Sequence, residues 1–332
     1  MAHDEQWLTP RLQTAATLCN QTPAATESPL WLGVDLGTCD VVSMVVDRDG
    51  QPVAVCLDWA DVVRDGIVWD FFGAVTIVRR HLDTLEQQFG RRFSHAATSF
   101  PPGTDPRISI NVLESAGLEV SHVLDEPTAV ADLLQLDNAG VVDIGGGTTD
   151  IAVLSLGGKV KATSVRVAGN HYDDEILKHV RNKFSIAIGQ RTAEQLKKNV
   201  ACCPQKADFD ETMEVKGRSL LTGLPIKVNV STSDLYEPVM MLSEQIGTAA
   251  HQVLEKTPPE LAGDIFRNGV VLTGGGAQLH GLPEYLSQEL KVDVTVSPDP
   301  VNCVALGTAM SLGLNDKLET GFLDATPRMG RR

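Results

Sequence analysis

A short apolar strand that ends in aspartate and runs into a glycine–threonine turn occurs twice in this chain of 332 residues. The first copy is LWLGVDLGT at residues 30–38, and the second is GVVDIGGGTTD at residues 140–150. Further apolar runs that read as antiparallel strands follow each copy. Because a unit that recurs along a chain indicates a duplicated architecture, the sequence predicts two similar α/β lobes that face one ligand.

Helix and strand signals fill the rest of both lobes. Over residues 71–89 apolar side chains recur at helical spacing, and Gly90 follows as a stop signal. After the second turn, residues 151–167 read as a hairpin. The remaining predicted elements are a strand at 96–100, helices at 105–117, 173–201 and 234–255, a mixed insertion at 207–230, and a strand, glycine triplet and helix at 270–290.

The expected domain organisation is two lobes with short additions at both ends. The last helix of the second lobe, which carries an inserted subdomain, is expected to return to the first lobe, whose outer subdomain is reduced. The expected bounds are 1–29 for an N-terminal extension, 30–144 for the first lobe, 145–315 for the second lobe and 316–332 for a tail.

The extension contains one candidate helix. Leu8, Leu12, Ala15 and Ala16 form an apolar stripe at helical spacing, and residues 20–29 read as a linker. A terminal helix docked on its own domain, or a frayed tail, is one interpretation, and a targeting helix for a partner is the other. Because a proline at position 10 interrupts the stripe, we favour the first.

Charge and cysteine content exclude several classes of function. The chain carries 28 Lys and Arg against 43 Asp and Glu, which gives a net charge of −15. Such an acidic surface repels phosphate backbones and anionic lipid, so neither nucleic-acid binding nor membrane association is expected. The six cysteines include no C-x-x-C pair, and no signal peptide or apolar run of membrane-spanning length occurs. A cytoplasmic protein with reduced thiols is therefore expected.

The two turns carry groups suited to phosphate binding. A glycine turn after a strand exposes backbone N–H groups to an anion, and the hydroxyls of Thr38, Thr148 and Thr149 add donors. Asp35 and Asp143 lie near the ends of their strands, where carboxylates can hold waters around Mg²⁺. No Walker A, dinucleotide-binding or nucleophile-elbow motif competes with this pattern. A nucleotide with Mg²⁺ is therefore the expected ligand.

Three segments resemble, in order, the nucleotide-binding motifs of the superfamily that contains actin, hexokinase and the seventy-kilodalton heat-shock chaperones. Residues 34–40 resemble its first phosphate loop, residues 141–151 its second, and residues 270–286 its adenosine motif. The resemblance covers most of residues 30–315. It implies an α/β, actin-like ATPase fold of the ribonuclease H type, in which duplicated lobes flank a cleft for ATP and Mg²⁺.

The resemblance also implies which residues contact the nucleotide. The first loop would contact the β- and γ-phosphates and the metal shell, and the second would do so from the facing lobe. The glycine triplet would let the backbone approach the α-phosphate and adenosine. The residues concerned are Asp35, Gly37 and Thr38, then Asp143, Gly145, Gly146, Gly147 and Thr148, and finally Gly274, Gly275 and Gly276.

Three further positions match superfamily roles but have simpler alternatives. Glu126 would position the attacking water and act in catalysis with Asp143, or it merely caps a helix that begins at Pro127. Glu194 and Lys197 would touch ribose and adenine, or they belong to a solvated helix face.

Two features depart from the superfamily pattern. Cys39 and Asp40 stand where relatives commonly have Thr or Ala and then Asn. Asp40 adds negative charge beside the phosphates, which favours weaker ATP binding or a changed metal demand. The segment between the first loop and Ser99 is also short. The expected activity is therefore slow Mg²⁺-dependent ATP hydrolysis, with binding without turnover as the alternative.

Within the superfamily, the two halves of the chain resemble different members. Residues 1–150 are similar to the chaperone-like J proteins of bacterial ethanolamine utilisation, in stretches such as RDGIVWD at 64–70 and SFPPG at 99–103. Residues 160–315 resemble the bacterial rod-shape actin homologues, for example at 166–198. A longer J-type protein and a mosaic of two relatives both stay open.

Three functions follow from these resemblances. The first is an ATP-binding, chaperone-like factor for assembly or reactivation of ethanolamine ammonia-lyase. Its partners would be that enzyme or other proteins of a bacterial microcompartment in the cytoplasm. The second is a filament-forming cytoskeletal ATPase that self-associates, although the reduced outer subdomain argues against it. The third is a small-molecule kinase, for which no sugar-binding cluster stands out.

Overall fold

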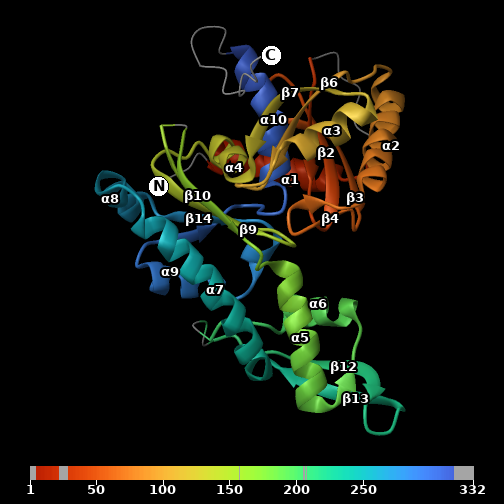
Figure 1. The fold of residues 1–332 in the computed structure, drawn as a ribbon, viewed down its shortest axis with the longest axis vertical. Helices are drawn as coiled ribbons and strands as arrows, with labels where there is room; N and C mark the ends of the chain where they lie inside the picture. Colours follow the sequence, from red (N-terminus) through yellow and green to blue (C-terminus); the bar gives the residue numbers. More distant parts are fainter. Residues whose placement is uncertain (1–4, 22–28, 157, 205, 207, 318–332) are drawn as a thin grey trace. The chain divides into compact units, whose positions relative to one another are not determined.

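The computed structural model describes residues 5–21, 29–156, 158–204, 206 and 208–317, and the chain divides into two compact units (Figure 1). Unit 1 comprises Met1–Asp137 with Val301–Arg332, and unit 2 comprises Asn138–Pro300. The boundary thus precedes the strand at 139–144 instead of following it, because that strand pairs with two strands of unit 2.

Five strands form the main sheet of unit 1, in the order β3-β2-β1-β6-β7. β2 is antiparallel to β1 and β3, whereas β1, β6 and β7 are parallel. A two-stranded ladder of β4 and β5 follows β3 along the chain. The bounds are β1 (Trp31–Leu36), β2 (Asp40–Val46), β3 (Pro52–Trp59), β4 (Val63–Arg64), β5 (Ile67–Val68), β6 (His95–Phe100) and β7 (Glu119–Asp125).

Several helices of unit 1 begin or end at local sequence signals. α2 (Phe71–Phe89) confirms the helix predicted over 71–89. The Asp70 carboxylate accepts a hydrogen bond from the Gly73 N–H at its start, and Gly90 ends it in the left-handed region. Gly117 ends α3 (Arg107–Ala116) in the same way. The others are α1 (Glu5–Leu18), α4 (Glu126–Leu134) and α10 (Cys303–Lys317).

The helix α10 packs against β1 and α4 of unit 1. A Cβ at Gly33 in β1 would lie 2.5 Å from the backbone nitrogen of Ala309, so only glycine allows this close approach. Leu306 and Ala309 are fully buried at this contact. The helix thereby supports the strand that carries Asp35.

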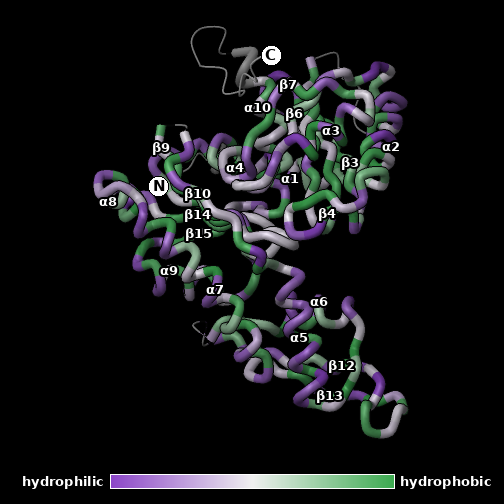
Figure 2. Tube along the Cα trace, in the orientation of Figure 1, coloured by the Kyte–Doolittle hydropathy of each residue, from purple (hydrophilic) through white to green (hydrophobic). Residues whose placement is uncertain are grey.

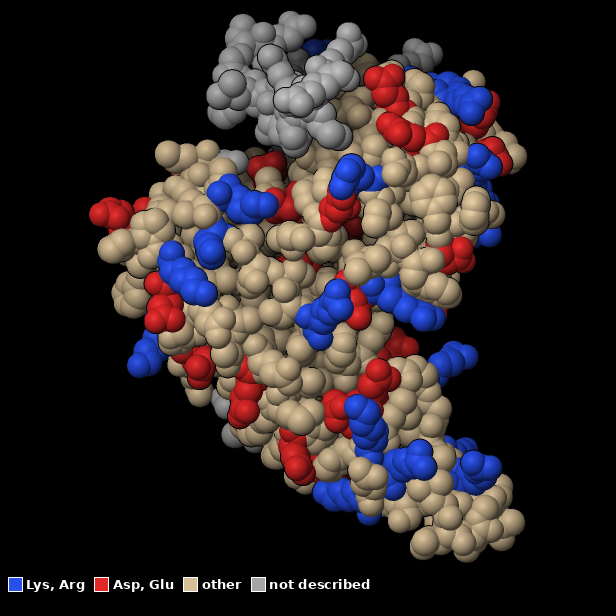
Figure 3. Space-filling view, viewed as in Figure 1, with Lys and Arg blue, Asp and Glu red and all other residues tan. Residues whose placement is uncertain are grey.

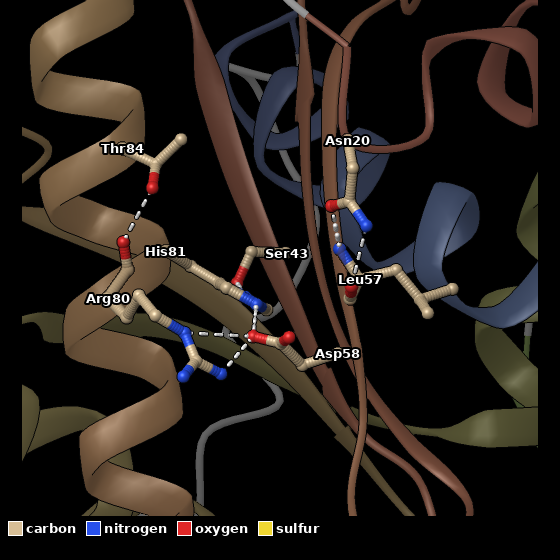
Figure 4. A network of polar contacts seen from close by, with 7 residues as sticks. All are labelled: Asn20, Ser43, Leu57, Asp58, Arg80, His81 and Thr84. Carbon is tan, nitrogen blue, oxygen red and sulfur yellow. Dashed lines mark hydrogen bonds and ion pairs between the residues drawn. The ribbon is translucent and has the colours of Figure 1, made fainter.

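The N-terminal helix α1 docks on unit 1, as the favoured interpretation of the extension predicted. Its apolar residues Leu8, Leu12 and Ala15 are buried, and α1 contacts β3. Asn20 then forms two hydrogen bonds with the edge strand β3. Its amide nitrogen donates to the Leu57 carbonyl (2.8 Å), and its Oδ1 accepts from the Leu57 N–H (2.9 Å; Figure 4). Residues 22–28 of the predicted linker lie outside the described residues.

Unit 2 repeats the sheet of unit 1. Its strand order is β10-β9-β8-β14-β15, with β9 antiparallel to β8 and β10, and with β8, β14 and β15 parallel. This pattern matches that of the first sheet strand for strand, so the predicted duplicated α/β fold is confirmed. The bounds are β8 (Ala139–Ile144), β9 (Thr149–Ser155), β10 (Gly158–Val165), β14 (Val270–Thr273) and β15 (Val294–Val296).

The other elements of unit 2 include a small sheet of β11, β12 and β13. One core of buried apolar side chains extends from β8 and β9 through α5 and α6 to α7 and α9. The bounds are α5 (Gly169–Phe184), β11 (Ile186–Ala187), α6 (Gln190–Asn199), β12 (Thr212–Ser219), β13 (Pro225–Ser231), η1 (Thr232–Leu235), α7 (Tyr236–Glu255), α8 (Pro259–Asn268), η2 (Gly275–Gln278) and α9 (Leu282–Leu290).

The prediction of one helical stretch over 173–201 is wrong in its middle. Ser185 has a φ of 52° and ends α5 in the left-handed conformation. The chain then forms β11, in which Ile186 pairs with Ser219 and is fully buried. A partner more than thirty residues away in the sequence thus overrides helical periodicity.

Hydropathy follows this architecture, since the strands at the centre of each unit are largely hydrophobic and α8 is largely hydrophilic (Figure 2). Among the described residues, no helix combines the length and the hydropathy needed to cross a membrane.

Candidate nucleotide-binding site

Asp35 and Asp143 occupy equivalent places in the two sheets. Asp35 is the next-to-last residue of β1, and Asp143 is the next-to-last residue of β8. Each of these strands is the middle strand of its sheet and is followed by a glycine turn. In α/β sheets, ligands bind at the carboxyl ends of such strands, so each unit presents its aspartate where a ligand is expected.

In unit 1, the first turn brings two carboxylates together. A Cβ at Gly37 would lie 2.8 Å from Oδ1 of Asp40, so the Asp40 side chain folds back against the turn. Ser99 on β6 donates a hydrogen bond to Asp35 (3.0 Å). Burial, together with the Asp40 carboxylate, raises the pKa of Asp35 to about 7, although the Ser99 hydrogen bond opposes this shift. Burial also raises the pKa of Asp40. The turn therefore favours a cation or a proton.

In unit 2, the second aspartate and the glycine triplet lie together. Asp143 is 4% exposed and pairs in register with Thr273 of the neighbouring strand β14. A Cβ at Gly274 would lie 2.3 Å from Oδ1 of Asp143, and the φ of this residue is 78°. Only glycine fits there. At Gly275 a Cβ would meet nothing within 4 Å, so the backbone is open to a ligand.

The second glycine turn is held from one side by the start of α5. The carbonyl of Gly145 accepts from the Gly169 N–H (3.0 Å), and that of Gly146 accepts from the Asn170 N–H (2.8 Å). Gly145 and Gly146 are partly exposed, whereas Gly147 is buried. These bonds engage the carbonyl oxygens of the turn and position its backbone.

The threonines of the second turn are engaged within the protein. The Thr148 hydroxyl donates to Oδ2 of Asp150 (3.0 Å), and the Thr149 hydroxyl donates to the carbonyl of Val167 (2.6 Å). Both hydroxyls were expected to donate to phosphate. In this structure they instead brace the hairpin that follows the turn.

Lys197 is linked to the second turn through Gly169, the first residue of α5. Its Nζ donates to the Gly169 carbonyl (2.9 Å) and to Oδ2 of Asp173 (2.9 Å), and its side chain is 17% exposed. Burial raises the pKa of Asp173, whereas Lys197 opposes that shift. The solvated-face alternative is therefore wrong for Lys197. Asp173 was not among the predicted site residues, and its only signal was an acidic residue shortly after Gly169.

Glu194 differs from Lys197 although both lie on α6. It forms an ion pair with Lys198 (2.6 Å), and its side chain is 45% exposed. Glu194 therefore fits the alternative of a solvated helix face. Glu194 nevertheless lies close enough to Asp173 to contribute to the raised pKa of that carboxyl group.

Glu126 is not the cap of α4. Asp125 occupies that position, and its Oδ1 accepts from the backbone N–H (3.2 Å) and the hydroxyl (2.8 Å) of Thr128. The capping alternative for Glu126 is therefore corrected. Glu126 is the first residue of the helix, is partly exposed, and lies at the carboxyl end of β7.

The residues of each unit fit a magnesium nucleotide. Unit 2 offers an open backbone at Gly275, a partly exposed glycine turn and a carboxylate at Asp143. Unit 1 offers Asp35 and Asp40. Burial raises the pKa of both carboxyl groups, and a bound cation would favour their charged forms. Mg²⁺ typically takes one or two carboxylates together with waters and phosphate oxygens, and this donor set suits it.

Known proteins resemble both halves of this chain. The Escherichia coli (strain K12) "Ethanolamine utilization protein EutJ" is 91% identical over 172 residues, which are 52% of this chain and 62% of that protein. The chain thus matches less than two thirds of that relative. The Bacillus subtilis (strain 168) "Cell shape-determining protein Mbl" is 33% identical over 323 residues, covering 86% of this chain and 97% of that protein.

Solved structures share the fold. MreB5 of Spiroplasma citri bound to AMPPNP has a TM-score of 0.76 and 27% identity, over 90% of this chain and 100% of that chain. EutJ from Carboxydothermus hydrogenoformans has a TM-score of 0.69 and 30% identity, over 92% and 99%. The model of the MreB/Mbl protein family matches residues 58–320. These matches confirm the resemblance to actin-like ATPases inferred from the glycine turns, and the chain belongs to the MreB/Mbl family.

Proposed function

We propose that this protein binds ATP with Mg²⁺ and acts in ethanolamine utilisation. In this role it would be a nucleotide-dependent factor that assists assembly or reactivation of ethanolamine ammonia-lyase in a bacterial microcompartment. The 91% identity to an ethanolamine utilisation protein over 172 residues supports the setting. The AMPPNP bound to the related MreB5 supports the ligand.

The contact between Asp143 and the glycine triplet carries the nucleotide part of the proposal. Gly274 leaves room for the Asp143 carboxylate, and Gly275 leaves the adjacent backbone open. Asp143 would hold waters of the metal ion, and the turn at 145–148 would hold phosphate oxygens through its backbone N–H groups. Bound Mg²⁺ would offset the charge of the phosphates. Lys197 would hold the start of α5 against this turn.

Unit 1 would supply two carboxylates of its own. Asp35 would hold metal waters from its own turn. Glu126 would accept a hydrogen bond from the attacking water, because a carboxylate at a strand end can orient water without being consumed. The Asp40 carboxylate near Asp35 favours slow turnover, because its negative charge repels the phosphates.

Calorimetric titration with ATP, with and without Mg²⁺, tests the nucleotide part. Wild-type protein should bind Mg-ATP, and Asp143→Ala should lose that binding because the metal waters lose their acceptor. The exposed Asp210→Ala in the same unit is the matched control and should bind like wild type. Wild-type affinity in Asp143→Ala would contradict the assignment.

Capture of ethanolamine ammonia-lyase tests the setting. Tagged protein with Mg-ATP, with ADP, and without nucleotide should retain the purified enzyme in at least one state. Failure to retain it in every state would argue against this partner, even if nucleotide binding were intact.

A filament-forming role is the second candidate, and the match of the MreB/Mbl family model to residues 58–320 favours it. It predicts pelletable polymer on addition of Mg-ATP to purified protein. Protein that stays in the supernatant at all concentrations would exclude this candidate.

A further inference from the structure

Unit 1 exposes an unusual number of large apolar side chains in one short segment, residues 59–72. Phe72 is 81% exposed and Trp59 is 74% exposed, and Ile67 and Trp69 are exposed as well. Soluble proteins rarely leave several aromatic side chains in water within one segment unless a partner covers them. We call Trp59, Ile67, Trp69 and Phe72 the aromatic patch.

The surroundings of the aromatic patch are acidic. Residues 58–72 contain four aspartates and one arginine, and one of these aspartates, Asp58, forms an ion pair with Arg80 of α2. The arginine of the segment, Arg64, forms an ion pair with Asp61 (2.8 Å) and stacks over the Trp69 ring at 4.0 Å, so its charge is already matched. Asp65, in the turn between β4 and β5, adds negative charge beside the patch. A partner for this patch should therefore bring apolar side chains and positive charge.

Unit 2 carries a segment with that chemistry at the tip of the β12–β13 hairpin. Leu221 is 84% exposed and Leu224 is 66% exposed, and Leu220 and Ile226 are exposed beside them. The turn itself is closed by hydrogen bonds from the Leu221 and Thr222 N–H groups to the Ser219 hydroxyl, so the tip holds a defined shape. We call Leu220, Leu221, Leu224 and Ile226 the leucine tip.

The strands below the leucine tip present a basic face. Lys216, Arg218 and Lys227 are exposed, and Lys216 lies opposite Lys227 in the strand register. Within residues 212–227 only Glu214 is acidic, and it pairs with Lys227 (2.8 Å). Figure 3 shows Lys and Arg side chains gathered near this hairpin, whereas its end is uncharged.

We propose that the leucine tip of one copy of this protein docks on the aromatic patch of a second copy. The two surfaces complement each other in both hydropathy and charge, and every copy carries both of them. Such a contact is heterologous, so it leaves a free tip at one end and a free patch at the other, and it extends into open chains or closes into rings. The inference rests on the self-association alternative above and is independent of the ethanolamine setting.

The size of the two surfaces sets the strength of the contact. Four large side chains on each partner cover less than the roughly 800 Å² per partner of a stable complex, so the contact is of the weak, reversible class. Opposite charges at its rim should speed association and make it sensitive to salt. Association is therefore expected at high protein concentration and low salt, and it should weaken at about 0.5 M NaCl.

Complementary variants test this contact by sedimentation velocity on the full chain. The tip variant is Leu221→Asp with Leu224→Asp, and the patch variant is Trp59→Ser with Phe72→Ser. Wild type should sediment faster as its concentration rises, and either variant alone should stay monomeric, with a dissociation constant at least about tenfold higher. Mixed together, the two variants should form a one-to-one complex and nothing larger, because one intact tip meets one intact patch. Phe266→Asp, at an exposed phenylalanine of α8, is the control and should associate like wild type.

Several results would overturn the proposal. Variants that associate like wild type would show that other surfaces carry self-association, and wild type that stays monomeric would exclude self-association altogether. A mixture that yields no complex would exclude docking of tip on patch. Circular dichroism spectra like that of wild type would show that the variants are folded. A basic leucine tip can also insert into anionic lipid, so flotation with phosphatidylglycerol vesicles supplies another arm. Vesicle binding that needs the leucine tip, without self-association, would assign the tip to a membrane instead.

Discussion

At the residue scale, the two acids of the first turn explain why a cation matters to this protein. Burial, together with the nearby Asp40 carboxylate, raises the pKa of Asp35 to about 7. The sequence could predict that Asp40 adds charge near phosphate, because the position departs from the superfamily pattern. It could not show that the Asp40 side chain folds back onto Gly37, since that depends on the shape of the turn.

Asp35→Asn should stabilise the protein at alkaline pH. The folded-state pKa of about 7 lies above the ordinary value of 3.8, so the folded protein binds this proton more tightly than the unfolded chain. The carboxylate therefore costs stability above pH 7, and this cost disappears as the pH falls toward 4. Urea unfolding at pH 8 should show a gain of about 2–4 kcal/mol for Asp35→Asn, and the gain should shrink greatly at pH 5. Equal gains at both pH values would contradict the raised pKa.

Lys197→Met should destabilise unit 2, because it leaves the buried Asp173 carboxylate without its ion pair. The expected loss in free energy of unfolding is about 2–4 kcal/mol. The matched control, Lys198→Met on the exposed face of α6, should cost less than about 0.5 kcal/mol. Adding Asp173→Asn to Lys197→Met should recover much of the loss, and failure to recover it would show that Lys197 acts through packing alone.

At the element scale, sequence signals predicted those elements whose ends are encoded locally. Asp70 and Gly90 delimit α2 by a side-chain cap and a left-handed glycine, and both can be recognised in the sequence. The break between α5 and α6 could not be recognised in the sequence. Ser185 is not a typical helix stop, and β11 forms only by pairing with β12. The capping alternative for Glu126 was wrong by one residue for a different reason, since Asp125 and Glu126 are both acids that suit a helix start.

The attachment of α2 to its sheet should depend on pH through His81. This residue is 3% exposed, and its ring nitrogens lie 2.9 Å from the Ser43 hydroxyl and 3.0 Å from Asp58 (Figure 4). Burial lowers the pKa of His81, although Asp58 opposes this shift. The folded protein therefore binds the proton less tightly than the unfolded chain, and stability is lost as the pH falls below the ordinary value of 6.5.

Thermal unfolding of the Asp35→Asn protein isolates the effect of His81. In wild type, protonation of Asp35 would raise the stability over the same pH range in which protonation of His81 lowers it. The unfolding temperature should fall between pH 7.5 and pH 5.5, and adding His81→Gln should remove most of that fall. An unchanged pH dependence in the His81→Gln protein would show that His81 does not titrate in this range.

At the scale of the whole molecule, the duplicated sheet was predictable because the same strand–Asp–glycine pattern is written twice in the sequence. The packing of α10 onto unit 1 depends on contacts between Gly33 and Ala309, which are far apart in the chain. The acidic net charge of −15 makes local neutralisation necessary for any polyanionic ligand. A magnesium nucleotide would meet that need, because Mg²⁺ offsets part of the phosphate charge.

Hydrogen exchange with and without Mg-ATP tests this central claim most directly. If the proposed residues bind the nucleotide, its addition should slow amide exchange at residues 34–40 in unit 1 and at residues 143–148 and 274–276 in unit 2. Asp143→Ala should abolish the protection at residues 143–148 and 274–276. Unchanged exchange at all three segments in folded wild-type protein would contradict the claim.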